Sequence, residues 1–434
     1  MRRWARRTAL GTGVVGMAAA LFVVGAAVGA PEDSGQPDTP AGSAAVDPLT
    51  RSITRLQLSL KQTPGNYRAW SELGLAYVTQ SRLTADPTFY PKAEGAFAKS
   101  LELLPKDNAD AITGQATLAA ARHDFAEALS LANKALRIND FSSTAYGVKA
   151  DALTELGRYD QAVLAVQRML DLQPGTPSFS RASYQRELRG DVPGAREALE
   201  RAAAATTNPA DKAFAQYYLG ELAWNSGDQP AAAPAYEAAL AQDPKYLLAL
   251  TGQAKALAPT DPTAALALYR EVVQAQPQPS YLIELGELLE STGQTAAAQE
   301  QYDVVRATQQ LFASSGANVD LELALFEADH GSPATALKYA SAAFRDRPDA
   351  ILVQDAYAWA LHKSGRSAEA LPIARKAQRL GTRLPYLRYH LGVIEAAVGE
   401  RAAARRSLSI ALDLNPTFNP LQAPAARKLL KSLG

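Results

Sequence analysis

Four histidines, His123, His330, His362 and His390, are the residues of this chain best suited to acid/base catalysis or metal binding near neutral pH. The last three lie in the final quarter of the chain, and Asp329 stands beside His330. If folding brought His330 and His362 together, they could form a metal site or an acid/base centre with neighbouring carboxylates. The sequence contains no His-x3-His pair, however, and histidines near helix ends are more often caps or solvated residues. We therefore predict no catalytic residue and no metal ligand.

Other catalytic signatures are missing from the sequence. It contains no Gly-x-Ser-x-Gly nucleophile elbow and no glycine loop of the kind that cradles phosphates. It contains no cysteine, which excludes disulfides, thiol catalysis, thiolate metal sites and a bacterial lipoprotein anchor. We expect no cofactor.

The charge of the chain is balanced, with 44 Lys plus Arg against 44 Asp plus Glu. Four arginines lie in the N-terminal leader, which has no acidic residue, so the remainder carries 44 − 4 = 40 basic against 44 acidic residues. A net charge of −4 gives no basic surface large enough to attract nucleic acid. We expect no nucleic-acid partner.

An alanine recurs along the chain at intervals of 33 to 38 residues. A glycine five residues before it, a small or apolar residue seven after it and a proline twelve after it recur in the same phase. Glycine at that place suits the left-handed end of a helix, so the four rows together predict repeated pairs of helices. The alanine row consists of Ala93, Ala128, Ala162, Ala195, Ala232, Ala265, Ala298, Ala336, Ala370 and Ala404.

The first of these units reads Trp-Ser-Glu-Leu-Gly-Leu-Ala-Tyr from Trp70 to Tyr77 and continues as Ala93, Phe97 and Pro105. Trp-x2-Leu-Gly-x2-Tyr followed by Ala-x3-Phe and Pro is the pattern of a tetratricopeptide repeat. The chain resembles this family from there to its end. The resemblance implies a right-handed α-α superhelix of about ten repeats that binds other polypeptides.

The resemblance also implies that partners bind on the concave face, which the first helices of the repeats form. Aromatic side chains there would offer large contact area at low entropic cost, and interface hot spots are enriched in Trp and Tyr. The glutamates of the set predict an acidic middle stretch that suits a basic or amphipathic partner. Selected by their phase on the first helices, the predicted groove residues are Tyr184, Glu187, Tyr217, Glu221, Trp224, Lys255, Glu287, Glu290, Asp355, Trp359, His362 and Tyr389.

The first repeat departs from the family pattern. Sixteen positions separate Tyr77 from Ala93, whereas nine separate Leu153 from Ala162. About seven residues are therefore inserted around residues 82–91. A lengthened hairpin of this kind is either a recognition feature or a tolerated insertion.

The N-terminus carries Arg2, Arg3, Arg6 and Arg7 before an uncharged stretch of residues 8–30. A helix of that length, at ~1.5 Å per residue, would cross the ~30 Å hydrocarbon core of a membrane. The arginines would stay in the cytoplasm, so we expect a single-pass cell-membrane protein with extracytoplasmic repeats. The alternative is a cleaved signal peptide, which would release a secreted or periplasmic protein.

The sequence thus predicts five segments. They are an anchor or signal at 1–30, a flexible linker at 31–47, a capping helix at 48–64, the repeats at 65–418 and a C-terminal capping helix at 419–434. We predict a non-enzymatic scaffold or adaptor for protein partners. A secreted or periplasmic assembly subunit is one alternative hypothesis, and a histidine- and carboxylate-dependent enzyme is another of a different class.

Overall fold

The computed structural model describes residues 48–434, which form α-helices joined by turns and loops, without a β-strand. The prediction of an all-α fold is confirmed. The predicted segments 1–30 and 31–47 lie outside the described residues. The helices are α1 (Pro48–Gln62), α2 (Tyr67–Thr84), α3 (Phe89–Leu103), α4 (Ala109–Ala121), α5 (Phe125–Ile138), α6 (Ser143–Glu155), α7 (Tyr159–Leu172), α8 (Thr176–Glu187), α9 (Val192–Ala204), α10 (Pro209–Ser226), α11 (Gln229–Gln242), α12 (Leu247–Leu257), α13 (Pro262–Ala275), α14 (Pro279–Ser291), α15 (Thr295–Ser314), α16 (Asp320–His330), α17 (Pro333–Asp346), α18 (Ile351–Lys363), α19 (Ser367–Ala377), α20 (Pro385–Ala397), α21 (Arg401–Leu414) and α22 (Gln422–Ser432).

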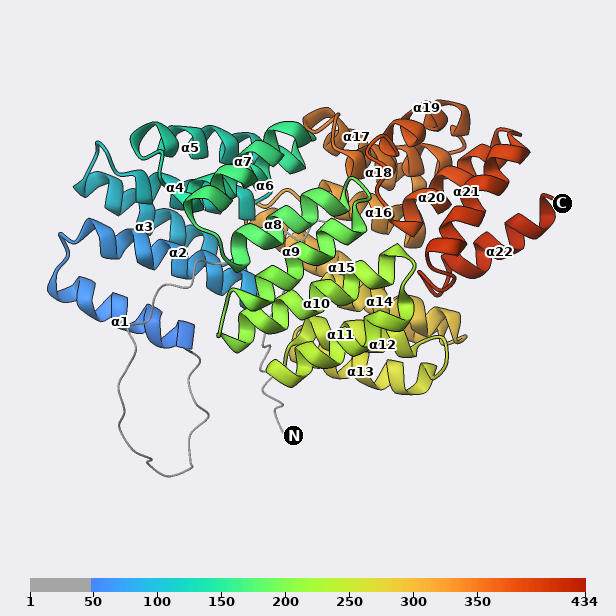
Figure 1. Cartoon of the computed structure of the whole chain (residues 1–434), viewed down its shortest axis with the longest axis horizontal. Helices are drawn as coiled ribbons and strands as arrows, with labels where there is room; N and C mark the ends of the chain where they lie inside the picture. The colour runs from blue at the N-terminus through green and yellow to red at the C-terminus, as the bar shows by residue number, and fades with distance from the viewer. Residues whose placement is uncertain (1–47) are drawn as a thin grey trace, which may run out of the picture.

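Helices α2 to α21 form ten pairs, from α2–α3 to α20–α21, which stack one after another (Figure 1). Each helix makes its most extensive contacts with the other helix of its pair, and each pair also packs on the next one. At the two ends, α1 packs on α2, and α22 packs on α20 and α21. This arrangement confirms the predicted solenoid of about ten repeats.

The recurrent alanines explain the pairing. Each of them lies on the second helix of a pair, and each is at most 1% exposed. Because the alanine side chain is a single methyl group, the first helix of the pair can approach closely at this point. No single repeat covers its own apolar face, so the stacking of neighbouring pairs completes the core.

A large residue four positions after the alanine fills the space between successive first helices. Tyr236 on α11 is fully buried between Gly220 on α10 and Gly252 on α12. A Cβ atom added to Gly220 would lie 2.4 Å from the Tyr236 ring, and one added to Gly252 would lie 2.5 Å from it. The two glycines therefore make room for the ring.

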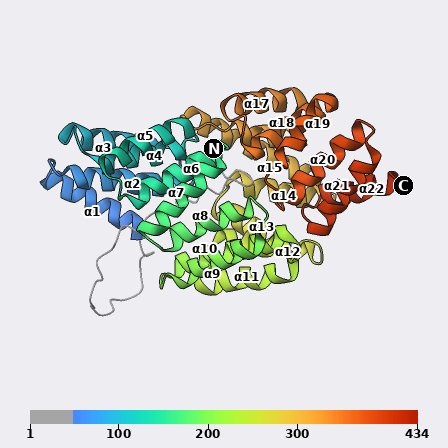
Figure 2. The ribbon, with the colours of Figure 1, turned by 45° about the horizontal axis from the view of Figure 1, so that its top comes forward.

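Successive turns of the superhelix touch each other. In both Figure 1 and Figure 2, α17 and α18 lie beside α6 and α7, although their sequences are far apart. Most of the contacting residues are separated by 185 to 196 positions, or roughly 5.6 repeats of ~34 residues per turn. The hydrogen-bonded pairs of this contact, which we call the seam, are Leu83–Gln276, Arg122–Asn318, His123–Asn318, Glu155–Arg347, Tyr159–Ile351, Trp224–Asn415, Ser226–Arg383 and Gln229–Leu414.

A buried ion pair lies within the seam. Arg347 donates a hydrogen bond of 3.1 Å to Glu155, and both side chains are less than 10% exposed. Burial raises the pKa of Glu155, and the positive charge of Arg347 opposes that shift. Next to this pair, the backbone N–H of Ile351 donates to the hydroxyl of Tyr159 at 2.9 Å. The seam is therefore a specific polar contact.

Glycines let the turns approach this closely. A Cβ atom on Gly157 would lie 2.2 Å from the backbone carbon of Asp349, and one on Gly190 would lie 2.5 Å from a backbone oxygen across the seam. Gly365 occupies the same turn of a later repeat with a similar left-handed backbone (φ of +79° against +74° for Gly157), but a Cβ there would meet nothing within 4 Å. Glycine at 157 therefore serves both the turn and the seam.

The predicted cell-membrane location is corrected by the structure. Among the helices of residues 48–434, none is both long enough and apolar enough to cross a membrane. These helices are amphipathic or alanine-rich because each buries one face against its neighbours and leaves another in solvent. The proposed span, residues 8–30, lies outside the described residues.

We predict that Gly220→Ala lowers the free energy of unfolding by about 1–3 kcal/mol, because the new methyl group overlaps the Tyr236 ring. Gly95→Ala is the matched control. Gly95 lies in α3 with open space around it, so alanine should raise stability by about 0.5–1 kcal/mol. Urea unfolding followed by circular dichroism measures both changes, and equal changes in the two variants would contradict the packing described here.

We also predict that Gly157→Ala opens the seam and enlarges the radius of gyration measured by small-angle X-ray scattering. Gly365→Ala introduces the same left-handed strain, about 1–2 kcal/mol, without a backbone clash. It should therefore lower stability but leave the radius unchanged. An unchanged radius in folded Gly157→Ala protein would show that the turns do not depend on this contact.

Candidate functional site

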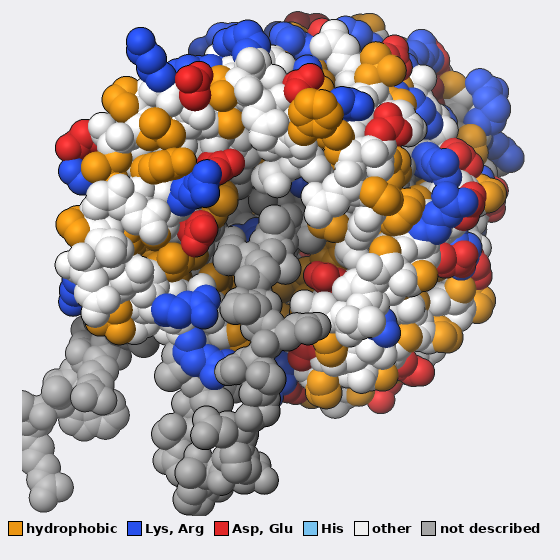
Figure 3. All heavy atoms as spheres, turned by 60° about the vertical axis from the view of Figure 1, so that its left-hand side comes forward, with side chains coloured by type: hydrophobic (Ala, Val, Ile, Leu, Met, Phe, Trp, Pro, Cys, Tyr) orange, Lys and Arg blue, Asp and Glu red, His pale blue; other side chains and the backbone are white. Residues whose placement is uncertain are grey.

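The concave side of the superhelix encloses a cavity of about 1480 Å³, which we call the inner cavity. The first helices α2, α4, α6, α8, α10, α12 and α14 line it, as the repeat pattern requires. Residues 382–386 and 417–427 of the second turn line its other side. Figure 3 shows the hollow from the side of α1–α5, with apolar and oppositely charged side chains around it.

An ion pair between two neighbouring repeats lies in the inner cavity. The ammonium group of Lys255 on α12 donates to both carboxylate oxygens of Glu221 on α10, at 2.6 and 2.9 Å. The hydroxyl of Tyr236 donates to the same carboxylate at 2.6 Å. The Lys255 nitrogen also lies 5.7 Å from the centre of the Trp224 ring. Glu221 and Lys255 are 34 residues apart, so they occupy equivalent places in successive repeats.

Tyrosines form the adjoining wall. The Tyr217 ring lies 5.0 Å from Tyr218 and 6.0 Å from Tyr246, in edge-to-face contacts. Burial raises the pKa of all three hydroxyl groups. They therefore stay neutral near pH 7, and all three residues line the cavity.

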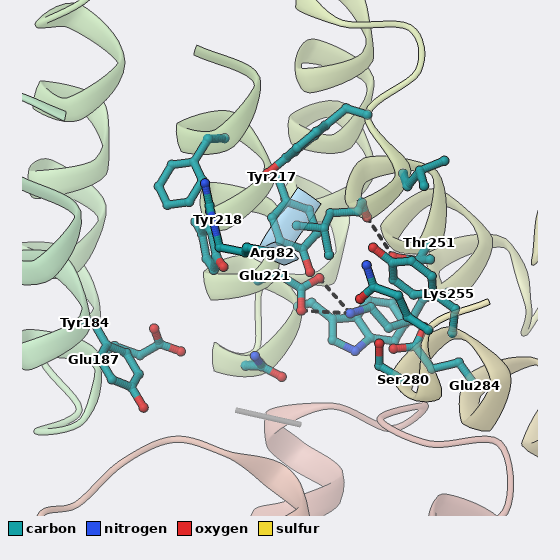
Figure 4. A pocket seen from close by; sticks show the side chains of 18 of the residues that line it. Arg82, Tyr184, Glu187, Tyr217, Tyr218, Glu221, Thr251, Lys255, Ser280 and Glu284 are labelled. Atoms are coloured by element: carbon teal, nitrogen blue, oxygen red, sulfur yellow. Dashed lines mark hydrogen bonds and ion pairs between the residues drawn. The ribbon is translucent and has the colours of Figure 1, made fainter. Parts of the chain in front are cut away.

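Two glutamates of the cavity titrate near neutral pH. Burial, together with the negative charge of Glu221, raises the pKa of Glu187 to about 7. Burial likewise raises the pKa of Glu284 to about 7, and the nearby Lys255 only partly opposes it. In Figure 4, Glu187 lies beside Tyr184 on α8, apart from the group around Glu221.

The structure brings seven of the twelve predicted groove residues to the inner cavity and leaves five outside it. Those that line the cavity are Tyr184, Glu187, Tyr217, Glu221, Trp224, Lys255 and Glu287. Those that lie outside it are Glu290, Asp355, Trp359, His362 and Tyr389.

Four of the five outlying residues belong to an aromatic cluster of α18 and α20. The Trp359 ring stacks between His362 and His390, with ring centres 5.2 and 4.1 Å away. The carboxylate of Asp355 lies 2.8 Å from Nδ1 of His390, and both residues are buried. Tyr389 packs near the same ring, at 5.9 Å. These side chains hold the last repeats together.

The chain itself covers part of the concave face near its end. Residues 415–422, which we call the C-terminal segment, connect α21 to α22 and line the inner cavity at positions 417–420. Their side-chain amides bind both the first turn and the middle repeats. The three hydrogen bonds are Asn415 to the Trp224 carbonyl (3.0 Å), Asn419 to Glu287 (2.8 Å) and Gln422 to Asp329 (3.1 Å).

The histidines have separate structural partners. His330 Nε2 lies 3.1 Å from Glu287, His362 Nδ1 lies 3.0 Å from the hydroxyl of Ser367, and His123 belongs to the seam. Within residues 48–434, no group of three or more histidine and carboxylate side chains is placed to hold a metal ion. These contacts favour a structural role for the histidines.

Several cavity residues escaped the sequence analysis. Glu284 lies one helix position from the phase used to select the groove, and Tyr246 lies in the loop before α12. Arg82 lines the cavity because the insertion in the first repeat lengthens α2 to Thr84. The insertion is evident in the sequence, and an extension of α2 by the inserted residues would have placed Arg82 at the cavity.

One family model described as tetratricopeptide repeat matches residues 113–177 and 189–246. Another model with the same description matches residues 352–376. No curated protein sequence matches the chain. Many solved structures resemble its fold, among them the following three. In the anaphase-promoting complex heterotetramer Cut9–Hcn1, 93% of the matched chain aligns with 89% of this one at 13% identity and a TM-score of 0.40. The alignment with the human IFIT1 dimer with m7Gppp-AAAA covers 76% of each chain, at 16% identity and a TM-score of 0.47. The alignment with yeast Tom70 covers 96% of that chain and 83% of this one, at 14% identity and a TM-score of 0.36.

We predict that Glu187→Gln makes the protein more stable than the wild type at pH 8 and nearly equal to it at pH 4.5. Between the unfolded pKa of 4.5 and the folded value of about 7, the folded protein keeps a proton that the unfolded chain releases. Stability of the wild type therefore falls as pH rises through this range, and glutamine removes that loss.

Chemical denaturation at pH 4.5, 6 and 8 measures this effect. Glu200→Gln, an exposed carboxylate of α9, is the control and should give a difference that does not vary with pH. A pH-independent difference for Glu187→Gln as well would contradict the assigned environment.

Proposed function

We propose that this chain, a tetratricopeptide-repeat protein, is a non-enzymatic adaptor whose inner cavity binds a segment of another protein. The observation that supports this most directly is the size of the cavity. At about 1480 Å³ it exceeds the ~300–1,000 Å³ of small-molecule sites, so it has room for a peptide segment.

The side chains of the cavity suit peptide recognition. Trp224, Tyr217 and Tyr246 provide rigid aromatic surface, and Trp and Tyr are the residues most enriched at binding hot spots. Glu221 and Lys255 offer a charge of each sign to polar groups of the ligand. A bound segment could therefore bury apolar side chains on the rings and hydrogen-bond to the ion pair.

We predict that Trp224→Leu weakens binding of the partner at least tenfold, whereas Trp359→Leu leaves it unchanged. Both residues are tryptophans at most 5% exposed, so the two substitutions disturb the core to a similar extent. Only Trp224 lines the inner cavity. The comparison therefore separates loss of a binding contact from general loss of stability.

The full chain serves as bait in a cell extract, and the captured protein is then purified for calorimetric titration. Circular dichroism verifies that both variants are folded at the temperature used. Equal weakening by both variants would place the site outside the inner cavity, and binding unaffected by either would do the same.

A further inference from the structure

Three polar atoms on α14 and its N-cap residue, all of them in residues that line the inner cavity, have no hydrogen-bond partner within residues 48–434. They are the amide oxygen of Gln278, the hydroxyl of Ser280 and the Oε2 atom of Glu284. Gln278 and Ser280 are only 6% and 8% exposed. Buried polar atoms nearly always have a partner, so three together at one wall of a cavity call for a ligand. We call these three residues the acceptor cluster.

The missing partners are hydrogen-bond donors. An ionised carboxylate can only accept, and the amide oxygen and the hydroxyl can accept as well. Ser280 and Glu284 are one helical turn apart and therefore lie on the same face of α14, as Figure 4 shows. A ligand that offers several N–H groups to this face would satisfy the acceptor cluster.

The charge nearby favours a cationic ligand. Lys255 donates to both carboxylate oxygens of Glu221, and its positive charge only partly opposes the effect of burial on the pKa of Glu284. Glu287, one turn further along α14, adds a second carboxylate to the cavity wall, and this one already accepts from Asn419 and lies 3.1 Å from His330 Nε2. Burial raises the pKa of Glu284 to about 7 although the charge of Lys255 lowers it, so the carboxylate is incompletely compensated.

The dipole of α14 limits where along the helix the positive charge of a ligand can lie. Its positive end disfavours a cation at Gln278, which precedes the first turn, but this effect fades beyond that turn. Glu284 lies in the second turn. The charged head of the ligand therefore belongs against Glu284 and Ser280, with neutral N–H contacts toward Gln278.

We propose that the acceptor cluster is a subsite for the guanidinium group of an arginine in the bound segment. This proposal rests on the proposed function of the inner cavity. A guanidinium group carries five N–H donors in a planar fork, which matches several acceptors on one face better than the compact ammonium of lysine. The buried rings of Tyr269 and Tyr281 also line this wall and offer flat surfaces to the planar group.

Nα-acetylarginine amide tests the subsite in the full chain without knowledge of the partner. We expect calorimetric titration to show saturable binding of this probe and none of Nα-acetylcitrulline amide, which has a similar shape but no charge. Glu284→Gln should weaken binding about tenfold or more, because a charge-assisted hydrogen bond is lost. Ser280→Ala should weaken it less, and Glu271→Gln, an exposed carboxylate of α13, should not change it.

Equal binding of the two probes, or wild-type binding by folded Glu284→Gln protein, would overturn the subsite. The captured partner separates this result from failure of the proposed function. A partner that still requires Trp224 but tolerates Glu284→Gln leaves the adaptor function standing and removes the arginine subsite. A partner that binds equally well without Trp224 and without Glu284 would contradict both the adaptor function of the inner cavity and the arginine subsite.

Discussion

The contact between successive turns of the superhelix determines the form of its concave surface. An open solenoid presents its concave side as a groove, whereas here the polar seam holds the second turn against the first. The buried pair of Glu155 and Arg347 contributes mainly specificity, because removing two charges from water offsets much of their attraction. The close backbone approach at Gly157 fixes the spacing of the turns. Together they convert a groove into a cavity.

The seam also changes how the repeats depend on each other. In most solenoids a repeat contacts only its neighbours, so stability is nearly a sum of local terms. Here the second and third repeats are hydrogen-bonded through His123 and Glu155 to the segments just before and just after the eighth repeat. Unfolding one end of the array therefore removes contacts from the other, and the ten pairs should lose structure together.

The repeated helix pairs could be predicted from the sequence because their causes are local. Small residues at Ala162 and its equivalents, and glycines in the turns, act within one repeat or between neighbours. The same periodicity placed Glu221 and Lys255 together, since both occupy one phase of the first helices.

The closure of the turns could not be predicted. It depends on small rotations per repeat that accumulate over more than five repeats, and no single residue type reports their sum. For the same reason the C-terminal segment could not be predicted to cover part of the concave face and to bind Trp224 and Glu287. It also could not show that Trp359 and Asp355 would lie in a buried aromatic cluster, because their phase matches that of Trp224.

The C-terminal segment sets the order in which the molecule is completed during synthesis. Chains emerge at ~5–20 residues per second, and their N-terminal parts fold first. Asn415 and Asn419 bind the Trp224 carbonyl and Glu287, which are translated 191 and 132 residues earlier. At that rate, the aromatic wall around Trp224 stays uncovered for roughly 10–40 s before the segment arrives. A nascent chain therefore exposes the wall of its inner cavity more widely than the finished protein does.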